Sequence, residues 1–166
     1  MIDPIIQSCT QLLEFVFRYE VGSDYFYILL AATAFVFSGT TWFLAKTFGG
    51  NAGVVLAVFA SLLPVALGII GFALAAVYLV PMFEADWAPA YLPWSAFALF
   101  ALLVILIASQ RMLGVGVIVS IVIFVMASAA GAIAYYGSDA LLKMADKGNQ
   151  GAIQEKKTRA IDQIVD

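Results

Sequence analysis

Residues 52–80 read AGVVLAVFASLLPVALGIIGFALAAVYLV, an apolar run without a charged side chain. A helix rises 1.5 Å per residue and the hydrocarbon core of a bilayer is about 30 Å thick, so roughly 20 apolar residues are enough to cross it. This run is longer than that. It therefore predicts a transmembrane helix, and Pro64 within it predicts a kink, because proline cannot donate a backbone hydrogen bond.

Three further apolar runs surround this one, at residues 25–45, 95–109 and 113–136. The composition agrees with a membrane protein: 64% of the residues are hydrophobic and 11% are charged, whereas a soluble domain carries roughly 25% charged residues. We therefore expect an all-α, polytopic membrane protein in which residues 25–137 form a bundle of four transmembrane helices.

The two ends of the chain have a different pattern. In residues 3–20, apolar and polar residues fall on opposite faces, which predicts an amphipathic helix at the membrane interface or in a groove of a partner. Residues 138–166 form a polar, amphipathic tail, and the sequence Gly-Asn-Gln-Gly at 148–151 predicts a helix break within it. Beyond this break an apolar stripe predicts a partner-docking face, formed by Ile153, Ala160, Ile161 and Ile164.

Small residues recur at helical spacing in the second and fourth predicted spans. Gly, Ala and Ser at such steps let helix backbones approach closely, and this packing drives helix association in lipid. We expect the stripes to pack inside the bundle, against other subunits, or both. The helix-packing residues are Gly53, Ala57, Ser61, Gly68, Gly71, Ala75, Gly116, Ser120, Ala127 and Gly131.

Hydroxyl groups are the main polar side chains at membrane depth, because no Asp, Glu, Lys or Arg lies within the four predicted spans. Pumps and coupled transporters need ionisable groups there, so the composition argues against a self-contained transporter. In transmembrane helices, Ser and Thr usually bond to the carbonyl three or four residues back. We expect such local bonds for Ser38, Thr40, Thr41, Ser61, Ser120 and Ser128.

Catalytic, cofactor and metal sites are not expected from this sequence. The chain has no histidine, and we interpret its one cysteine, Cys9, as a small buried residue. Glu84 and Asp86 lie beside Trp87 and would suit acid–base chemistry on a lipid, but no histidine or cysteine accompanies them. We interpret this pair as a solvated loop and the protein as a non-enzyme with no cofactor and no bound metal.

The positive charges predict opposite orientations in the membrane. More Lys and Arg lie on the side of the termini, which favours termini inside. Against this, each short loop carries one cation close to a span (Lys46 and Arg111), and the 81–94 loop on the side of the termini has acidic residues but no cation. Weighting the short loops, we expect a protein of a prokaryotic inner (plasma) membrane with both termini outside.

Together these features predict a structural or accessory subunit of a larger integral membrane assembly, docked to its partners through the terminal helices. The expected partners are other membrane-protein subunits, in a hetero- or homo-oligomer, and the lipid bilayer. Nucleic acid is not expected, because the net charge is −3 and no basic patch lies outside the tail. The alternative is a homo-oligomeric pore, either holin-like or a membrane subunit of a secretion channel, since hydroxyls and carbonyls can line a pore.

Overall fold

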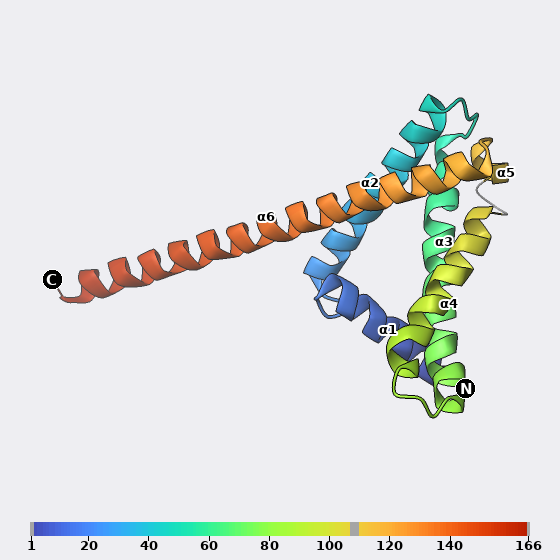
Figure 1. Cartoon of the computed structure of the whole chain (residues 1–166). Helices are drawn as coiled ribbons and strands as arrows, with labels where there is room; N and C mark the ends of the chain where they lie inside the picture. The colour runs from blue at the N-terminus through green and yellow to red at the C-terminus, as the bar shows by residue number, and fades with distance from the viewer. Residues whose placement is uncertain (1, 107–109, 166) are drawn as a thin grey trace.

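The computed structural model describes residues 2–106 and 110–165, without the side chains of residues 110 and 148–165. Every regular element in these ranges is helical, so the expected all-α fold is confirmed there (Figure 1). The elements are α1 (Asp3–Phe17), α2 (Asp24–Thr47), α3 (Val54–Leu74), the π-helix η1 (Ala75–Leu79), the 3-10 helix η2 (Val80–Met82), α4 (Ala88–Val104), α5 (Gln110–Leu113) and α6 (Val117–Val165).

Three helical stretches of the described ranges are long and apolar enough to cross a membrane, which is compatible with an integral membrane protein. They are Asp24–Thr47, Val54–Met82 and Val117–Lys147. The remaining predicted span corresponds to α4, which has 17 residues. At 1.5 Å per residue α4 is about 25 Å long, a little less than the thickness of the hydrocarbon core.

The helix α4 begins earlier than the predicted span at residues 95–109, although two prolines lie near its start. Pro89 lies in the first turn, where a missing N–H costs nothing because it would have no helical partner. Pro93 lies one turn further, so the bond that it cannot make would end on the carbonyl of Pro89, in the exposed first turn. The helix therefore begins at Ala88, and the predicted loop over residues 81–94 shortens to residues 83–87.

The predicted helix break at residues 148–151 is wrong, because α6 continues through it to Val165. Each glycine costs about 1 kcal/mol in a helix interior. The neighbouring residues are strong helix formers (Ala, Gln, Glu, Lys and Arg), and they outweigh this cost. The last predicted span and the predicted tail thus form one helix, which extends far beyond the other elements in Figure 1.

Two antiparallel helix pairs form the framework: α2 packs along α6, and α3 packs along α4. Contacts between α2 and α3 join the pairs, and α5 lies against α3. At the other end α1 packs on α3 and η1 and touches α2, so that α1, α2 and α3 outline a triangle in Figure 1. The predicted bundle is therefore two helix pairs that meet at one end and are bridged by α1 at the other.

Two separate clusters of buried side chains hold these ends together. One lies where α2, α3, α5 and α6 meet, and it includes Ala45, Ala57, Leu113 and Ile123. The other joins the end of α1 to the start of α2 through Phe17, Phe26 and Leu29, with Tyr135 and Leu142 of α6 packed against it.

Candidate functional site

An apolar cavity of about 290 Å³ lies between the two helix pairs, and we call it the inter-pair cavity. The cavity opens to the surface, so a molecule can enter it, and its volume is close to that of the smallest small-molecule sites, about 300 Å³. A cavity of this size is therefore a candidate binding site. Its walls include Leu13 and Val16 of α1, Leu30 and Thr33 of α2, Val65 and Ile69 of α3, Trp94 and Phe97 of α4, and Ser128 and Ala132 of α6.

A second cavity of about 350 Å³ adjoins the first, because Leu12 and Trp94 line both. It also contains polar side chains of α1, Ser8 and Gln11. Trp94 anchors the boundary: its ring centroid lies 5.1 Å from that of Phe72 in α3, within the 4.5–7 Å range that aromatic pairs prefer. The two cavities together form an apolar space with a more polar end.

The helix α1 reaches these cavities because its C-terminus is fixed. Arg18 has a left-handed backbone (φ 58°), and its N–H donates to the carbonyl of Glu14 at 2.7 Å. The Glu14 carboxylate in turn accepts from the N–H of Val21 at 3.2 Å, and Ser23 caps α2 by accepting from the N–H of Phe26. The helix α1 ends at Phe17 rather than at residue 20, and it packs on α3 and η1 of its own chain.

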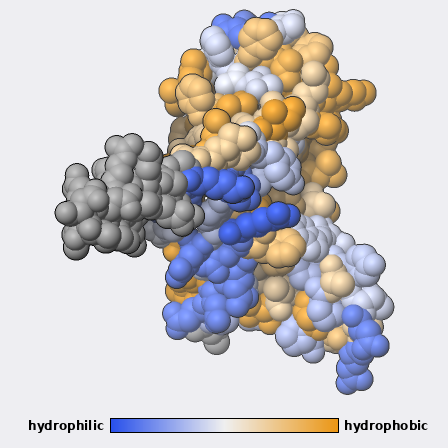
Figure 2. Space-filling model, turned by 90° about the vertical axis from the view of Figure 1, so that its left-hand side faces the viewer, coloured by the Kyte–Doolittle hydropathy of each residue, from blue (hydrophilic) through white to orange (hydrophobic). Residues whose placement is uncertain are grey.

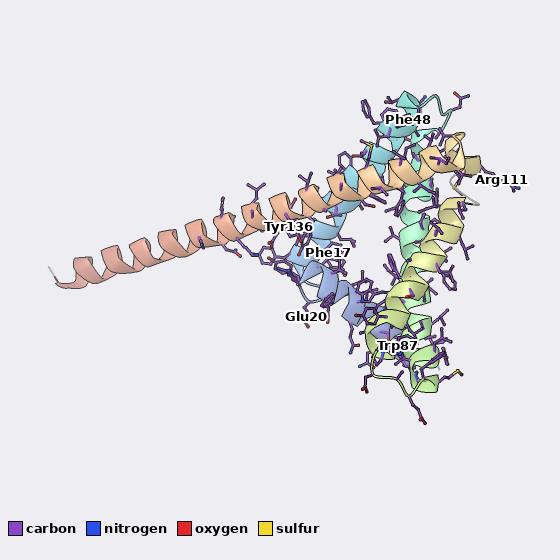
Figure 3. The ribbon with its side chains drawn as sticks, viewed as in Figure 1. Phe17, Glu20, Phe48, Trp87, Arg111 and Tyr136 are labelled. Atoms are coloured by element: carbon purple, nitrogen blue, oxygen red, sulfur yellow. The ribbon has the colours of Figure 1, made fainter. Side chains whose placement is uncertain are left out.

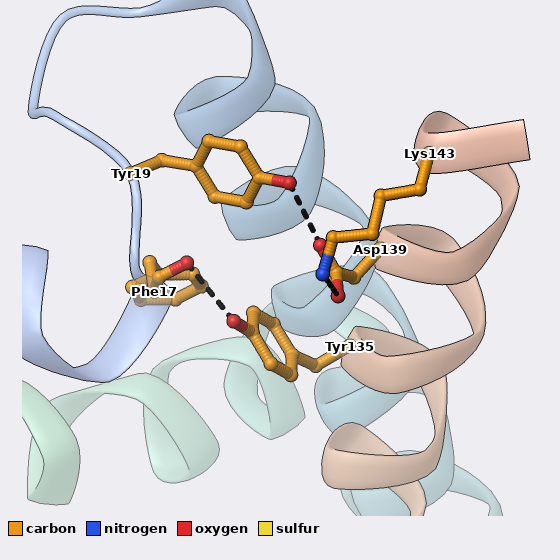
Figure 4. Close-up of polar contacts among 5 residues, drawn as sticks. All are labelled: Phe17, Tyr19, Tyr135, Asp139 and Lys143. Carbon is orange, nitrogen blue, oxygen red and sulfur yellow. Dashed lines mark hydrogen bonds and ion pairs between the residues drawn. The ribbon is translucent and has the colours of Figure 1, made fainter. Parts of the chain in front are cut away.

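A polar junction, made of Tyr19, Tyr135, Asp139 and Lys143, ties the α1–α2 turn to α6 (Figure 4). The Tyr19 hydroxyl donates to Asp139 Oδ1 at 2.8 Å, and the Tyr135 hydroxyl donates to the Phe17 carbonyl at 2.9 Å. Lys143 Nζ lies 2.7 Å from Asp139 Oδ2. The hydrogen bond to Asp139 raises the pKa of Tyr19 to about 12, helped by burial and by the negative charge of that carboxylate.

Hydrophilic residues gather near the start of the grey C-terminal segment in Figure 2, below a largely apolar surface. Further along α6, Tyr25 of α2 donates to Asp146. Charged and aromatic side chains at one level of a membrane protein are typical of the interface between lipid and water. Figure 3 shows Glu20 and Trp87 towards this side, whereas Phe48 and Arg111 lie at the opposite end of the molecule.

The predicted packing residues fall into two groups. Gly68 and Gly71 lie against α4, where an added Cβ would be 2.8 Å from the rings of Phe97 and Phe100 respectively. Gly131 faces Phe37 of α2, with 3.6 Å to its Cβ. Others of the set are buried, namely Ala57, Ser61, Ala75, Ser120 and Ala127.

The second group of packing residues lies at the beginnings of helices. Gly53 and Gly116 are exposed, and an added Cβ would meet no atom within 4 Å at either position. Pro64, the predicted kink residue, lies inside α3 and is fully buried. The predicted docking residues, Ile153, Ala160, Ile161 and Ile164, have side chains outside the described part of the chain.

Most hydroxyls in the predicted spans have partners on the protein itself. Thr41 and Ser128 donate to the carbonyls four residues back, and Ser61 donates to the one three back. Ser38 and Ser61 also share a hydrogen bond of 2.9 Å that links α2 to α3. Ser120 differs, because its buried Oγ has no hydrogen-bond partner in the described structure. The sequence did not reveal this inter-helix bond, because each serine could equally well bond to a carbonyl of its own helix.

The acidic pair and the cysteine singled out in the sequence lie apart from each other. Glu84 and Asp86 are exposed in the α3–α4 loop, and the described residues contain no cluster of three or more His, Cys, Asp or Glu. Cys9 is half-buried, and burial raises the pKa of its thiol.

Gly50 makes a close backbone contact that the sequence did not reveal. An added Cβ at this position would overlap the carbonyl oxygen of Leu113.

Comparison with known proteins adds no family to this description. No family model matches the chain, and neither curated proteins nor solved structures gave a match.

Proposed function

We propose that α4 is a fourth transmembrane helix, so that residues 25–137 cross the membrane four times. α4 packs along α3, and its aromatic rings lie directly on Gly68 and Gly71 of that helix. Past α4, the short helix α5 lies beside the start of α3. A helix that accompanies a spanning neighbour from one end to the other crosses the same layer, and the membrane can thin locally by a few ångströms to match a short span.

Cysteine labelling tests this topology and the proposed orientation, with both termini outside a prokaryotic inner membrane. In a Cys9→Ala background, Trp87→Cys and Gln150→Cys should react from the same side, and Asn51→Cys from the other. An impermeant thiol reagent added to intact cells should label positions 87 and 150. Labelling of these two positions from opposite sides would refute four spans, and labelling of neither in intact cells would refute the orientation.

We infer that the protein is a structural or accessory subunit of a larger integral membrane assembly, without a catalytic step of its own. The observation that carries this proposal is the length of α6. Its hydrogen bond from Tyr25 to Asp146 ties it to α2, and past this level the helix projects away from the other elements to Val165 (Figure 1). An isolated helix in water is marginal, so a projecting helix of this length is expected to be stabilised by a partner.

Exposed apolar side chains on α6 support the same role. Leu141 and Met144 are each 68% exposed, and both lie past Asp139, where the chain has already become polar. Large exposed apolar residues in such a place favour a helix-docking surface. The inner face of α1 packs on its own chain, so α6 is the main docking element of the proposal.

Co-purification from native membranes tests the subunit role. The tagged protein, extracted in mild detergent, should carry at least one other membrane protein in a fixed ratio. Leu141→Lys or Met144→Lys should reduce this ratio, whereas Ala145→Lys, a matched change at an exposed neighbour, should preserve it. A stable monomer without accompanying chains would refute the proposal.

The homo-oligomeric pore gains less support from the side chains. A hydroxyl-lined pore requires Ser and Thr that face a shared channel, whereas Thr41, Ser61 and Ser128 bond to their own helices. Conductance in reconstituted bilayers separates the two functions. A structural subunit is expected to give none, and a reproducible unitary current would favour the pore.

A further inference from the structure

The inter-pair cavity contains very little polar surface, although five helices contribute to it. Two hydroxyl residues line it. Ser128 already donates to the carbonyl of Phe124 at 2.8 Å, whereas the buried Thr33 Oγ1 has no hydrogen-bond partner in the described structure and could bind one water. Each ordered internal water needs two to four polar partners. One unpaired hydroxyl cannot order the several waters that about 290 Å³ would hold, so water is a poor occupant for most of this space.

The inter-pair cavity is also too small to enclose a helix. One turn of a helix about 10 Å wide, with a pitch of 5.4 Å, fills about 420 Å³. The cavity holds about 290 Å³, which is less than a single turn of a partner or of a second copy. A thin, flexible alkyl chain fits such a volume, which lies near the lower end of the roughly 300–1,000 Å³ found for small-molecule sites.

The adjoining cavity provides a polar end for such a chain. Ser8 and Gln11 of α1 line it, and Leu12 and Trp94 separate it from the inter-pair cavity. Tryptophan favours the level of lipid headgroups in membrane proteins. The two cavities thus present apolar and polar surfaces in the order in which a phospholipid presents its acyl chain and its headgroup.

We propose that the inter-pair cavity holds one acyl chain of a membrane phospholipid, with the headgroup end beside Ser8 and Gln11. The acyl chain already lies in the hydrocarbon layer, so binding removes none of its apolar surface from water and the hydrophobic effect does not drive it. It is held by the dispersion contacts that the cavity walls would otherwise lack. This lipid site is independent of the subunit role, because it needs no partner protein.

Native mass spectrometry of the full chain, released from phosphatidylcholine nanodiscs, tests the site. The wild-type protein should retain one phosphatidylcholine per chain. Ala132→Phe and Val65→Phe fill the cavity from α6 and α3, and each should reduce the retained lipid by about tenfold or more. The matched controls are Ala129→Phe and Ala66→Phe, at exposed positions on the same two helices that do not line the cavity. These controls should retain lipid as the wild type does.

Quenching by brominated lipid gives a second measurement that needs no cavity-filling variant. In a Trp42→Phe, Trp87→Phe protein, Trp94 is the sole tryptophan. Reconstitution into phosphatidylcholine brominated close to the headgroup end of its acyl chains, followed by extraction into bromine-free detergent, should leave Trp94 quenched by the retained lipid. Full recovery of its fluorescence on extraction would overturn the proposal.

Two results of the mass measurement would also overturn it. The first is a wild-type chain without lipid, or cavity-filled variants that retain as much lipid as their controls. The second is loss of a dimer, rather than of a lipid mass, on filling the cavity, because this would assign the space to a second copy. Co-purification of other subunits does not enter either result, so failure of the lipid site and failure of the proposed function are distinguishable.

Discussion

A single methyl group at Gly71 tests how closely α3 and α4 pack. An ideal Cβ at this position would lie 2.8 Å from ring carbons of Phe100 and 3.2 Å from the carbonyl oxygen of Ala96. The first distance is shorter than real Cβ contacts, and the second involves backbone, which cannot turn aside as a side chain can. Gly71→Ala therefore forces the ring to move and α4 to shift slightly away from α3.

The size of the effect follows from two opposing terms. Overpacking costs about 1–3 kcal/mol, whereas replacing glycine by alanine within a helix gains up to about 1 kcal/mol. Gly39→Ala in α2 measures the propensity gain alone, because Gly39 is exposed and an added Cβ there would meet no atom within 4 Å. We expect Gly71→Ala to be less stable than Gly39→Ala by about 1–3 kcal/mol, a difference from which the propensity term cancels.

Reversible unfolding in mixed micelles, followed by far-ultraviolet circular dichroism as the share of denaturing detergent rises, measures this difference. Phe100→Ala completes a double-mutant cycle, because removal of the ring relieves the main clash and should recover part of the lost free energy of unfolding. The reasoning is refuted if Gly71→Ala is as stable as Gly39→Ala. It is equally refuted if Phe100→Ala has the same effect with Gly71 as with alanine at that position.

Three further predictions concern other contacts. The Ser38 and Ser61 hydroxyls lie 2.9 Å apart, so Ser38→Ala and Ser61→Ala should show a coupling energy of about 0.6 kcal/mol in a double-mutant cycle of unfolding, the average for hydrogen bonds between membrane helices. Strictly additive losses of stability would contradict the bond. Gly50→Ala should lower the free energy of unfolding by more than about 1 kcal/mol, since its Cβ would collide with two backbone carbonyl oxygens; an unchanged thermal midpoint would argue against this contact. The pKa of Tyr19 is raised from 10.0 to about 12 by its hydrogen bond to Asp139, so the stabilisation is complete below about pH 10 and is lost as the pH rises through about 12. The phenolate absorbance of the wild type minus that of Tyr19→Phe should titrate near pH 12, and a midpoint near pH 10 would show that the bond is absent.

Local features of the fold were accessible from the sequence because single segments determine them. The composition of residues 52–80 alone predicts a helix. The structure has helix from Val54, and a π-turn and a 3-10 turn continue it to Met82. Proline and glycine were less reliable guides. Pro93 lies inside a helix, and the glycines at 148–151 do not end one, because the surrounding residues decide whether such a cost is tolerated.

The candidate site depends on contacts between distant segments, which periodicity does not encode. Tyr19 and Asp139 are 120 positions apart, and nothing in either local sequence selects the other. The amphipathic pattern of residues 3–20 indicated an apolar face but not its partner, which is the chain's own α3 and η1. The inter-pair cavity likewise results from which helices pair, and apolar spans are interchangeable by composition.

Because α6 is one uninterrupted helix, a small tilt of it produces a larger displacement at its C-terminal end. From Asp146 to Val165 the helix continues for about 30 Å at 1.5 Å per residue, so a tilt of about 10° at Asp146 moves its far end by about 5 Å. The hydrogen bonds of Tyr19 and Tyr25 to α6 lie close to the pivot and oppose such a tilt. A small change in the angle between α2 and α6 would therefore be enlarged at Val165, far from the two hydrogen bonds that hold the helices together.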